Sequence, residues 1–570
     1  MGSNRRSTFP GQKYSLPELF RSESFTFFGM ADLLPVEVPE DYTRALNRSH
    51  TGEINAIPDE RLFSYGTAGF RENADVLPFI VYRVGYLAGL RARHLNKSIG
   101  VMITASHNPE NDNGVKIIDP EGEMLTGEWE KYATELINTS DEQLPTAVRA
   151  LEVQLAPSNC SSARVVCAMD TRISGPRLME AAKAGASLLE VEFHSHGVLT
   201  TPQLHYIVRT ENDPSFGPNG ELGYYTFIGD AFTELFELTP LIGDYSPVLH
   251  LDCANGVGAK KMRILHRFLP ERALKIDFLN ENGVLNHQCG ADFVKISCKF
   301  PDGFENIPTG EKCAVFDGDA DRLVYFYRRN DGGLELLDGD KIALLLSKFL
   351  QEQLSALGLL SSLSMAVVQT AYANGSSSDY IRKHLGLSPV FVPTGVKHLH
   401  HEAVNHDVGV YFEANGHGTV VFSQKFKDEI KKVEGTEAGK RIALLSRVIN
   451  ETVGDAMADL LAVEIVLRHY GWSVEKWASL YRDAPSRQIK VPVNDRSAFT
   501  TTHDETRLTK PAPLQMKIDE LVQSSGEGAR AFVRPSGTEN IVRVYAEAAG
   551  SEEAQALAEA VHKAVLEYAL

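Results

Sequence analysis

Apolar residues in this chain form short runs that alternate with longer segments of helical spacing. Residues 99–103 are a continuous apolar run, and residues 76–94 carry apolar side chains on both faces of an expected helix. Residues 165–169 and 248–251 are further apolar runs, each followed by a polar loop and then a helical pattern. Strands alternating with helices predict α/β layers containing parallel strands, with ligand-binding loops beyond the carboxyl ends of the strands.

The end of the chain follows a different pattern. Residues 529–533 and 540–547 are expected to form two strands around a Pro-Gly loop, followed by a terminal helix. We predict domain boundaries near residues 199–202, in the polar stretch 299–312, and around residues 483–487. A length of 570 residues suggests roughly three to five domains, in agreement with these boundaries.

Composition narrows the class of protein. Hydrophobic residues make up 43% and charged residues 23%, which is ordinary for a globular protein, and no apolar run approaches the ~18 residues of a membrane span. The formal net charge of −18 argues against nucleic acid and anionic membranes as partners. The six cysteines form no C-x-x-C pair, and the N-terminus lacks the apolar core of a signal peptide. We therefore expect a reduced, cytoplasmic protein.

Residues 104–109, Thr-Ala-Ser-His-Asn-Pro, follow the apolar run at 99–103. Pro109 disfavours helical angles at Asn108, so no helix is expected to start there and Ser106 is presented on a constrained loop. For these six residues alone, a polar turn that bonds its own backbone remains the alternative.

Asp317, Asp319 and Asp321 alternate along a loop between two apolar runs. Three carboxylates this close repel one another unless a cation neutralises them. An EF-hand is excluded, because its positions 6 and 12 require Gly and Glu, whereas Arg322 and Arg328 stand there. Oxygen ligands alone favour Mg²⁺ over Zn²⁺, and a solvated acidic turn is the alternative.

Two further loops are suited to a small polar ligand. Residues 413–418, Glu-Ala-Asn-Gly-His-Gly, offer an acceptor and an amide that could bind neighbouring sugar hydroxyls. The loop at 65–71 is rich in small residues and ends in Arg71, which could meet a phosphate or carboxylate. His398 belongs to a group of four histidines, but no H-E-x-x-H motif is present and zinc is disfavoured.

Residues 534–540, Arg-Pro-Ser-Gly-Thr-Glu-Asn, form the clearest anion-binding loop. Arg534 supplies a planar fork, and Gly537 frees backbone N–H groups to point inward. Ser536 and Thr538 add hydroxyls, and Arg543 could add a second guanidinium. A plain hairpin turn is the alternative, because Pro-Ser-Gly is ordinary turn chemistry.

In this order, a nucleophilic serine, a carboxylate metal loop, a sugar loop and a phosphate loop resemble the α-D-phosphohexomutase superfamily. The resemblance runs from about residue 65 to the C-terminus and includes residues 285–292 and 369–375. Asn415 points to the N-acetylglucosamine branch, because hexose mutases usually carry Ser at that place. Asn540 departs from the Pro of many members, and the first ~60 residues have no counterpart.

The resemblance implies four domains around a central cleft, three related α/β domains with mixed sheets and a C-terminal α+β domain. We expect an N-terminal extension at 1–50 and domains at 51–200, 201–312, 313–482 and 483–570. The implied reaction interconverts N-acetylglucosamine 6-phosphate and 1-phosphate, on the route to UDP-N-acetylglucosamine, through phosphorylated Ser106 and a sugar 1,6-bisphosphate intermediate.

The resemblance also assigns residues to each role. Mg²⁺ would be bound by Ser106, Asp317, Asp319 and Asp321. Substrate would be bound by Glu413, Ala414, Asn415, Arg534, Pro535, Ser536, Gly537, Thr538 and Arg543. Proton transfer would fall to Lys116, His398 or Arg71. The expected partner is a sugar phosphate, and the protein is expected to be a monomer or a weak homo-oligomer.

Other functions remain open. The chain could be a glucose or mannose phosphomutase, although Asn415 argues against this. A phosphatase is less favoured, because enclosing domains would exclude water from the phosphoserine. An inactive sugar-phosphate-binding member is opposed by the presence of Ser106 together with all three aspartates.

Overall fold

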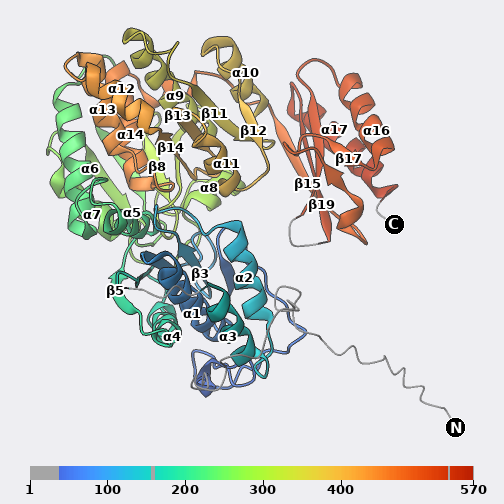
Figure 1. The fold of residues 1–570 in the computed structure, drawn as a ribbon. Coiled ribbons are helices and arrows are strands. Elements are labelled where there is room, and N and C mark those ends of the chain that lie inside the picture. Colours follow the sequence, from blue (N-terminus) through green and yellow to red (C-terminus); the bar gives the residue numbers. More distant parts are fainter. Residues whose placement is uncertain (1–37, 156–160, 537–539, 569–570) are drawn as a thin grey trace.

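A computed structural model describes residues 38–155, 161–536 and 540–568, whose helices and strands form four units, each built on a main sheet (Figure 1). The first sheet has the strand order β1-β3-β2-β4-β5, with β2 parallel to β4 and antiparallel to β3. Its strands are β1 Phe70–Asn73, β2 Ser98–Ile103, β3 Asp112–Ile118, β4 Arg164–Met169 and β5 Glu192–Val198. Its helices are α1 Leu77–Leu95, α2 Gly127–Asn138, α3 Leu144–Leu155 and α4 Gly175–Ser187. The predicted helix at 76–94 and the predicted strand at 99–103 are confirmed.

The second sheet has the order β10-β9-β8-β6-β7 and again mixes parallel and antiparallel pairs. Its strands are β6 Val248–Asp252, β7 Lys275–Leu279, β8 Cys313–Phe316, β9 Leu323–Arg328 and β10 Leu334–Leu337, with helices α7 Gly258–Leu265 and α8 Ala291–Ser297. Because β8 pairs with β6, this sheet runs across the boundary expected at 312/313. The loop between β8 and β9 carries the three aspartates.

The third sheet has the order β12-β11-β13-β14. Its strands are β11 Met365–Thr370, β12 Val390–Val392, β13 Val408–Phe412 and β14 Gly418–Phe422. Helices around it are α9 Gly339–Ala356, α10 Gly375–His384, α11 Val396–Ala403, α12 Gln424–Val433, α13 Glu437–Val448, α14 Ala456–Tyr470 and α15 Val474–Ala478. Helices α5 Thr201–Asn212 and α6 Gly220–Glu237 lead from the first unit to the second.

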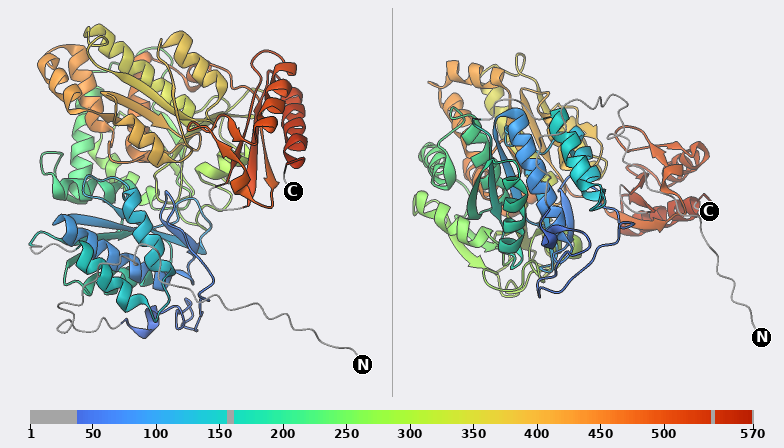
Figure 2. Two further views of the ribbon diagram at one scale, coloured as in Figure 1. Left: turned by 45° about the vertical axis from the view of Figure 1, so that its right-hand side comes forward. Right: turned by 60° about the horizontal axis from the view of Figure 1, so that its bottom comes forward.

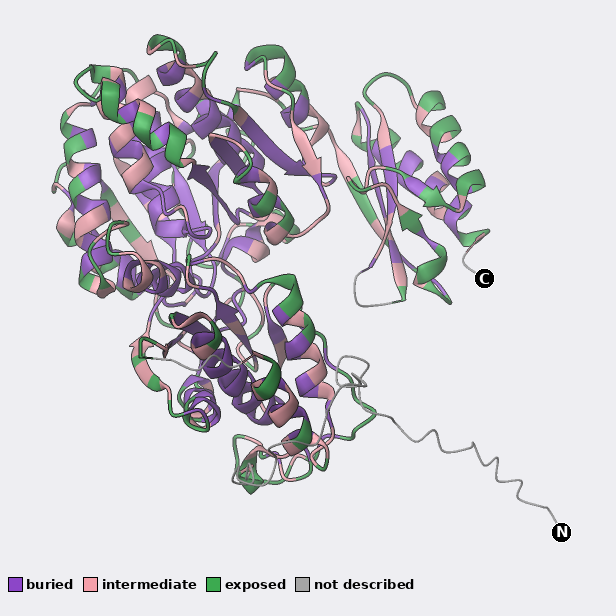
Figure 3. Ribbon diagram, viewed as in Figure 1, coloured by how far each residue is buried: buried purple, intermediate pink, exposed green. Residues whose placement is uncertain are grey.

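One apolar core joins these three units. It extends in sequence from Met102 to Ala478 and includes buried side chains of the second and third sheets and of α5, α6 and α14. Figure 3 shows this continuous buried interior, with exposed residues mainly on the outer helices. The loops at the strand ends of the first three sheets are therefore held in a fixed relation, which matters for any site built from them.

The C-terminal unit is separate from that core. It has an antiparallel sheet of order β15-β19-β18, a small hairpin and two helices that bury their own apolar cluster. Its elements are β15 Ser486–Pro492, β16 Thr500–Thr501, β17 Leu508–Lys510, α16 Ala512–Ser524, β18 Arg530–Pro535, β19 Ile541–Glu547 and α17 Ser551–Leu566. Figures 1 and 2 show this unit standing to one side of the rest. The predicted fold class, with three mixed α/β sheets and a C-terminal α+β unit, is confirmed.

The contact between the C-terminal unit and the third unit includes an aromatic cluster and hydrogen bonds, among them Arg530 Nη2 to the Ala373 carbonyl at 2.6 Å. Tyr372 and Ala371 pack against Phe532 and Tyr545. Within the described residues, no helix is long and apolar enough to cross a membrane.

Candidate active site

Ser106 lies three residues after the end of β2, in a tight turn in which it is fully buried. Its backbone φ is 50°, a left-handed conformation that is uncommon for a residue other than glycine and that occurs where surrounding structure enforces it. The Ser106 N–H donates to Thr104 Oγ1 at 2.9 Å, and the Asn108 N–H donates to the Ala105 carbonyl at 3.0 Å. The turn predicted from Pro109 is therefore present and points the serine hydroxyl in a defined direction.

Two planar side chains from different sheets hold this turn. Arg172, in the loop after β4, donates to the carbonyl oxygens of Ser106 and Asn108 at 3.2 and 2.7 Å. Asn286, in the loop after β7, donates to the same two oxygens at 2.8 and 3.1 Å. Sequence reasoning assigned neither residue a role, although Asn286 lies in the stretch 285–292 that carries the family resemblance. The signal that could have found them is their position, because each follows the carboxyl end of a predicted or observed parallel strand.

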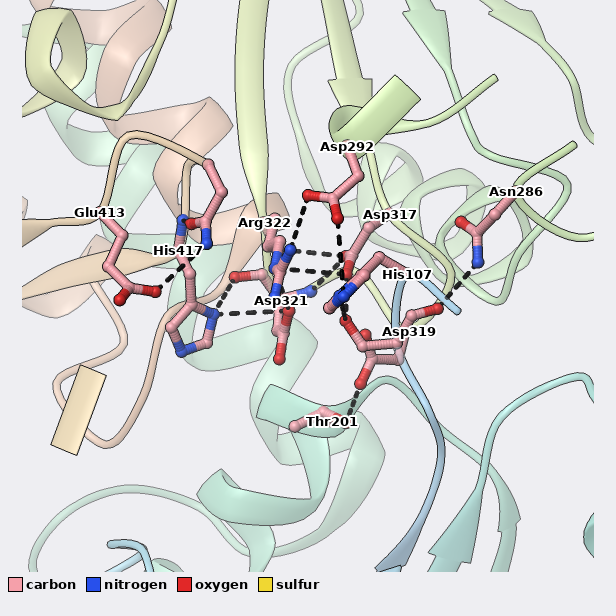
Figure 4. A network of polar contacts seen from close by, with 12 residues as sticks. His107, Thr201, Asn286, Asp292, Asp317, Asp319, Asp321, Arg322, Glu413 and His417 are labelled. Atoms are coloured by element: carbon pink, nitrogen blue, oxygen red, sulfur yellow. Dashed lines mark hydrogen bonds and ion pairs between the residues drawn. The ribbon is translucent and has the colours of Figure 1, made fainter. Parts of the chain in front are cut away.

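The metal loop lies against the serine turn. Ser106 Oγ donates to Asp317 Oδ2 at 2.5 Å. Thr201 Oγ1 donates to Asp319 Oδ2 at 2.6 Å (Figure 4). Gly318 allows this approach, because a Cβ there would lie 2.5 Å from the Ser106 carbonyl oxygen. The structure thus brings together two loops that are more than 200 residues apart in sequence.

The three carboxylates form a site suited to a hard cation. Asp317, Asp319 and Asp321 are buried and each offers one ligand atom, all within 4.8 Å of one another. Within the described residues they are the only group of three or more His, Cys, Asp or Glu placed in this way. Asp319 Oδ1 is buried and has no hydrogen-bond partner, and burial together with the neighbouring carboxylates raises the pKa of Asp317 well above its usual value. An all-oxygen donor set with an unused acceptor fits Mg²⁺.

Basic groups surround the third aspartate. Lys116 Nζ lies 3.9 Å from Asp321 Oδ2, and His417 Nδ1 lies 3.4 Å from Asp321 Oδ1. Burial acts to raise the pKa of Asp321, but His417 and Lys116 outweigh it and lower that pKa well below its usual value. Asp321 is therefore held ionised by its basic neighbours, whereas Asp317 needs a cation to favour its ionised form.

A second charged group borders the serine. Arg322 Nη1 donates to Asp292 Oδ1 at 2.7 Å, and His107 Nε2 lies 3.5 Å from Asp292 Oδ2. Burial, followed by the positive charge of Arg322, lowers the pKa of His107 to about 3, so the imidazole is neutral at physiological pH. None of these three residues was assigned a role from the sequence.

The expected sugar loop adjoins the metal loop. Asn415 Nδ2 donates to Glu413 Oε2 at 3.2 Å, with Ala414 between them in the turn, and His417 Nδ1 lies 2.8 Å from the Asp321 carbonyl oxygen. Gly416 has φ 88°, and a Cβ there would lie 2.1 Å from the Leu323 carbonyl oxygen. Figure 4 shows Glu413 and His417 on one side of the aspartates.

The expected phosphate loop is in the C-terminal unit. Arg534 on β18 and Arg543 on β19 are direct partners across the antiparallel pair, and like charges in that position are unfavourable without an anion between them. Arg534 Nε lies 2.6 Å from Glu505 Oε2, and Pro535 ends β18 before Ser536. Gly537 and Thr538, also predicted to bind phosphate, lie outside the described residues.

The three acid/base candidates are in two places. Lys116 stands beside Asp321, and Arg71 on β1 donates from Nη1 to Asn108 Oδ1 at 3.4 Å, within the serine turn. Burial, then Arg322, lowers the pKa of Arg71. His398 lies on α11, close enough to Glu505 to interact with its charge, and burial lowers the pKa of His398.

Two sizeable cavities are elsewhere in the molecule. One of about 780 Å³ lies between α10 and the C-terminal unit, and one of about 660 Å³ lies between α5, α6, α12 and α13. Neither is lined by Ser106, Asp317 or Glu413, so cavity size alone would point away from the loops that carry the chemistry.

Family models cover most of the described chain. Residues 217–324 and 338–472 match domains II and III of phosphoacetylglucosamine mutase AMG1. Residues 87–144 match the alpha/beta/alpha domain I, and residues 489–564 the C-terminal domain, of phosphoglucomutase/phosphomannomutase. These matches do not define where one domain ends and the next begins, so the domain boundaries expected from the sequence stay predictions.

Full-length relatives extend the similarity. Phosphoacetylglucosamine mutase of Sus scrofa is 46% identical over 527 residues, covering 90% of this chain and 96% of the relative. The crystal structure of Aspergillus fumigatus N-acetylphosphoglucosamine mutase in complex with GlcNAc-6P and magnesium has a TM-score of 0.85 at 44% identity and covers 90% of this chain and 97% of its own. A variant of that enzyme in complex with glucose 1,6-bisphosphate has a TM-score of 0.84 at 43% identity, covering 94% of this chain and 100% of its own. The chain belongs to the phosphoacetylglucosamine mutase family of the α-D-phosphohexomutase superfamily.

Proposed function

We propose that this protein interconverts N-acetylglucosamine 6-phosphate and N-acetylglucosamine 1-phosphate through a phosphoserine at Ser106. The observation that carries the proposal is the 2.5 Å hydrogen bond from the Ser106 hydroxyl to Asp317, inside a buried group of three carboxylates. A hydroxyl in this position can accept and return a phosphoryl group beside a metal site. The A. fumigatus relatives with GlcNAc-6P, magnesium and a 1,6-bisphosphate support the same substrate class.

The metal site follows from the donor set. Asp317, Asp319 and Asp321, with the phosphate of Ser106, would hold Mg²⁺. The ion supplies positive charge that stabilises the transition state of phosphoryl transfer. Arg322 and Lys116, on the two sides of Asp321, add further positive charge from the chain itself.

The reaction is two phosphoryl transfers in opposite directions. In the first, the bond between phosphorus and Ser106 Oγ breaks while the free sugar hydroxyl oxygen bonds to phosphorus. The hydroxyl proton leaves, and Ser106 Oγ regains a proton as the sugar 1,6-bisphosphate forms. After the bisphosphate turns around, its other phosphate returns to Ser106 by the reverse step, so the enzyme is regenerated and no phosphate is consumed.

The turn held by Arg172 and Asn286 keeps Ser106 Oγ in line for both transfers, since a fixed geometry removes much of the entropic barrier. Glu413, Ala414 and Asn415 would bind sugar hydroxyls in either orientation. The phosphate that does not react would be held by Arg534, Pro535, Ser536, Gly537, Thr538 and Arg543. Binding energy at that remote phosphate positions the reacting end of the sugar.

Proton transfer needs a group beside the reacting oxygen. Lys116 lies beside Asp321 and Arg71 bonds the serine turn, and we assign proton transfer to Lys116, because an arginine does not give up its proton in proteins. The charged Lys116 amine would protonate the departing Ser106 Oγ and then take up the proton released by the sugar hydroxyl. His398, near Glu505, would instead contact the bound substrate from the phosphate side.

The cellular setting follows from the product. A sugar 1-phosphate is the substrate for nucleotidyl transfer, which places the enzyme in UDP-N-acetylglucosamine biosynthesis. Free thiols at the five described cysteines are consistent with the reducing cytoplasm. A monomer or weak homo-oligomer suffices, because one chain supplies all the proposed groups.

The test is turnover with Mg²⁺ and a catalytic bisphosphate, on N-acetylglucosamine 6-phosphate and glucose 6-phosphate side by side. We expect a clear preference in kcat/KM for the acetylated sugar. Equal or reversed preference would leave the phosphoserine chemistry in place and show that Asn415 does not select the acetylated substrate. Absence of turnover on both would contradict the proposed function.

A further inference from the structure

Glu505 links the predicted phosphate loop to the neighbouring unit through a single oxygen atom. Its Oε2 lies 2.6 Å from Arg534 Nε and accepts hydrogen bonds from the backbone N–H and the hydroxyl of Thr394, at 2.9 and 2.6 Å. Thr394 belongs to the third unit, where it precedes α11. One carboxylate oxygen thus accepts two hydrogen bonds from the third unit and forms an ion pair with the C-terminal unit.

The donors around Glu505 are those that a phosphate uses. A guanidinium, a backbone N–H and a hydroxyl are the usual partners of a phosphate oxygen. The carboxylate therefore occupies part of an anion site instead of forming an ordinary surface ion pair. Its position is fixed by the chain, because the side chains of Glu505 and Arg534 are only 15% and 17% exposed.

The turn between β16 and β17 holds Glu505 in this position. Glu505 has φ 57°, an uncommon left-handed conformation for a glutamate. Its N–H donates to the Thr502 carbonyl at 3.0 Å, and Asp504 accepts from the hydroxyls of Thr502 and Thr506 at 2.5 and 2.8 Å. The turn is held by its own side chains, so its strained residue is enforced locally.

Charge balance indicates that a bound substrate phosphate displaces the Glu505 carboxylate from Arg534. Arg534 and Arg543 face each other across β18 and β19 and carry two positive charges. A phosphate monoester brings about −2 at pH 7, which balances these two groups without a carboxylate. With the phosphate bound, the charge of Glu505 would no longer be needed to neutralise the two arginines, and the phosphate would repel it.

We propose that the Glu505 carboxylate is a resident competitor for the substrate phosphate, holding Arg534 and Thr394 together until the phosphate displaces it. The inference rests on the proposed function, because it takes Arg534 as a phosphate ligand. Arrival of substrate then exchanges a carboxylate link between the third and C-terminal units for a link through the phosphate. Departure of the phosphate restores the carboxylate contact and favours release.

Calorimetric binding of inorganic phosphate and of N-acetylglucosamine 6-phosphate to the full chain tests this. Ser106→Ala serves as background, so that no turnover occurs. Glu505→Gln keeps an acceptor for Thr394 but removes the charge, and we expect about three- to fivefold tighter binding of both ligands, the size of one partly exposed ion pair. Glu520→Gln on α16, where the side chain is 67% exposed and pairs with Lys517, removes the same charge and should leave both affinities unchanged.

Unchanged or weaker binding in Glu505→Gln would overturn the inference, since it would make Glu505 a positioning group for Arg534. With Ser106 present, Glu505→Gln should lower KM and leave the kcat of the chemical step unchanged, which a merely structural role would not do.

The binding and turnover experiments distinguish a failure of this inference from a failure of the proposed function. If Arg534→Ala weakens phosphate binding but Glu505→Gln does not tighten it, only the role of Glu505 fails. If Glu505→Gln tightens binding but the protein with Ser106 intact shows no mutase turnover, the role of Glu505 is supported and the proposed reaction fails. If neither Arg534→Ala nor Glu505→Gln changes phosphate binding, both are overturned.

Discussion

The serine centre and the predicted phosphate site differ in how they are built. Ser106, Asp317 and Asp319 are fully buried, and their loops are joined by hydrogen bonds and by direct backbone contact between the first two sheets. Arg534 and Arg543 stand on a small antiparallel sheet with its own core. This unit contacts the third unit through aromatic rings and through polar contacts that include Glu505–Thr394, Arg530–Ala373 and Glu547–Gly375.

The difference matches two different tasks. Phosphoryl transfer requires donor and acceptor atoms held in one geometry, so the group that reacts is fixed by a core shared among three units. A phosphate that must be released and rebound as the bisphosphate turns around needs a site that can open. A unit with its own core can move relative to the rest, as domains commonly do when an enzyme closes on its substrate.

Removal of the serine hydroxyl gives the largest expected effect. Ser106→Ala should lower kcat by more than about 10³-fold, the scale of losing a covalent nucleophile. Affinity for N-acetylglucosamine 6-phosphate should change little, because Arg534 and Glu413 lie in other units. Single-turnover assays and calorimetry on the same variant separate the two quantities, and substantial residual turnover would contradict the phosphoserine.

Loss of one carboxylate should disable the metal site. Asp319→Asn keeps the shape and the contact with Thr201 but removes a charge from the triad. We expect apparent Mg²⁺ affinity to fall at least about 10- to 100-fold, the range already seen when groups outside the ligand set are removed. The readout is the midpoint of a Mg²⁺ titration of activity.

Asp292→Asn is the matched control for that experiment. Asp292 pairs with Arg322 in the same cluster but does not belong to the triad. Its replacement should lower the rate through Arg322 while the Mg²⁺ midpoint stays near that of the unaltered protein. An equal shift of the midpoint in both variants would remove the assignment of the metal to the aspartates.

Local sequence patterns were enough to predict the serine turn and the acidic loop. Pro109 constrains the turn, and alternating aspartates between apolar runs leave few alternatives to a cation. Both inferences depend on neighbours in sequence, so they do not require knowledge of the fold. The mixed sheets followed from the resemblance to a family, whereas the two C-terminal strands and the terminal helix were predicted from the residue pattern itself.

Contacts between distant segments could not be predicted from the sequence. Asn286 and Arg172 meet at the same two carbonyl oxygens only because the second sheet stacks its strand ends on the first. Glu505 is an ordinary acidic residue in a polar turn until β16 and β17 place it beside Arg534. The second sheet also continues past residue 312, because the pairing of β8 with β6 is a long-range contact that leaves no mark in composition.

The smallest expected effect is that of Arg534→Ala, which tests whether the C-terminal unit contributes to substrate binding and not to the chemical step. Arg534→Ala removes one charged donor from the remote phosphate, and losing such a hydrogen bond costs about 1.5 kcal/mol, which corresponds to roughly a tenfold rise in KM. Because the contact exists in both substrate orientations, KM should rise for the 6-phosphate and the 1-phosphate alike. Arg487→Ala, an exposed arginine on β15 that contacts Gln555, removes the same charge from the same sheet and should leave KM unchanged. A fall in kcat with constant KM in Arg534→Ala would mean that this arginine acts in the chemical step, and the division between a rigid reacting centre and a movable binding unit would then be wrong.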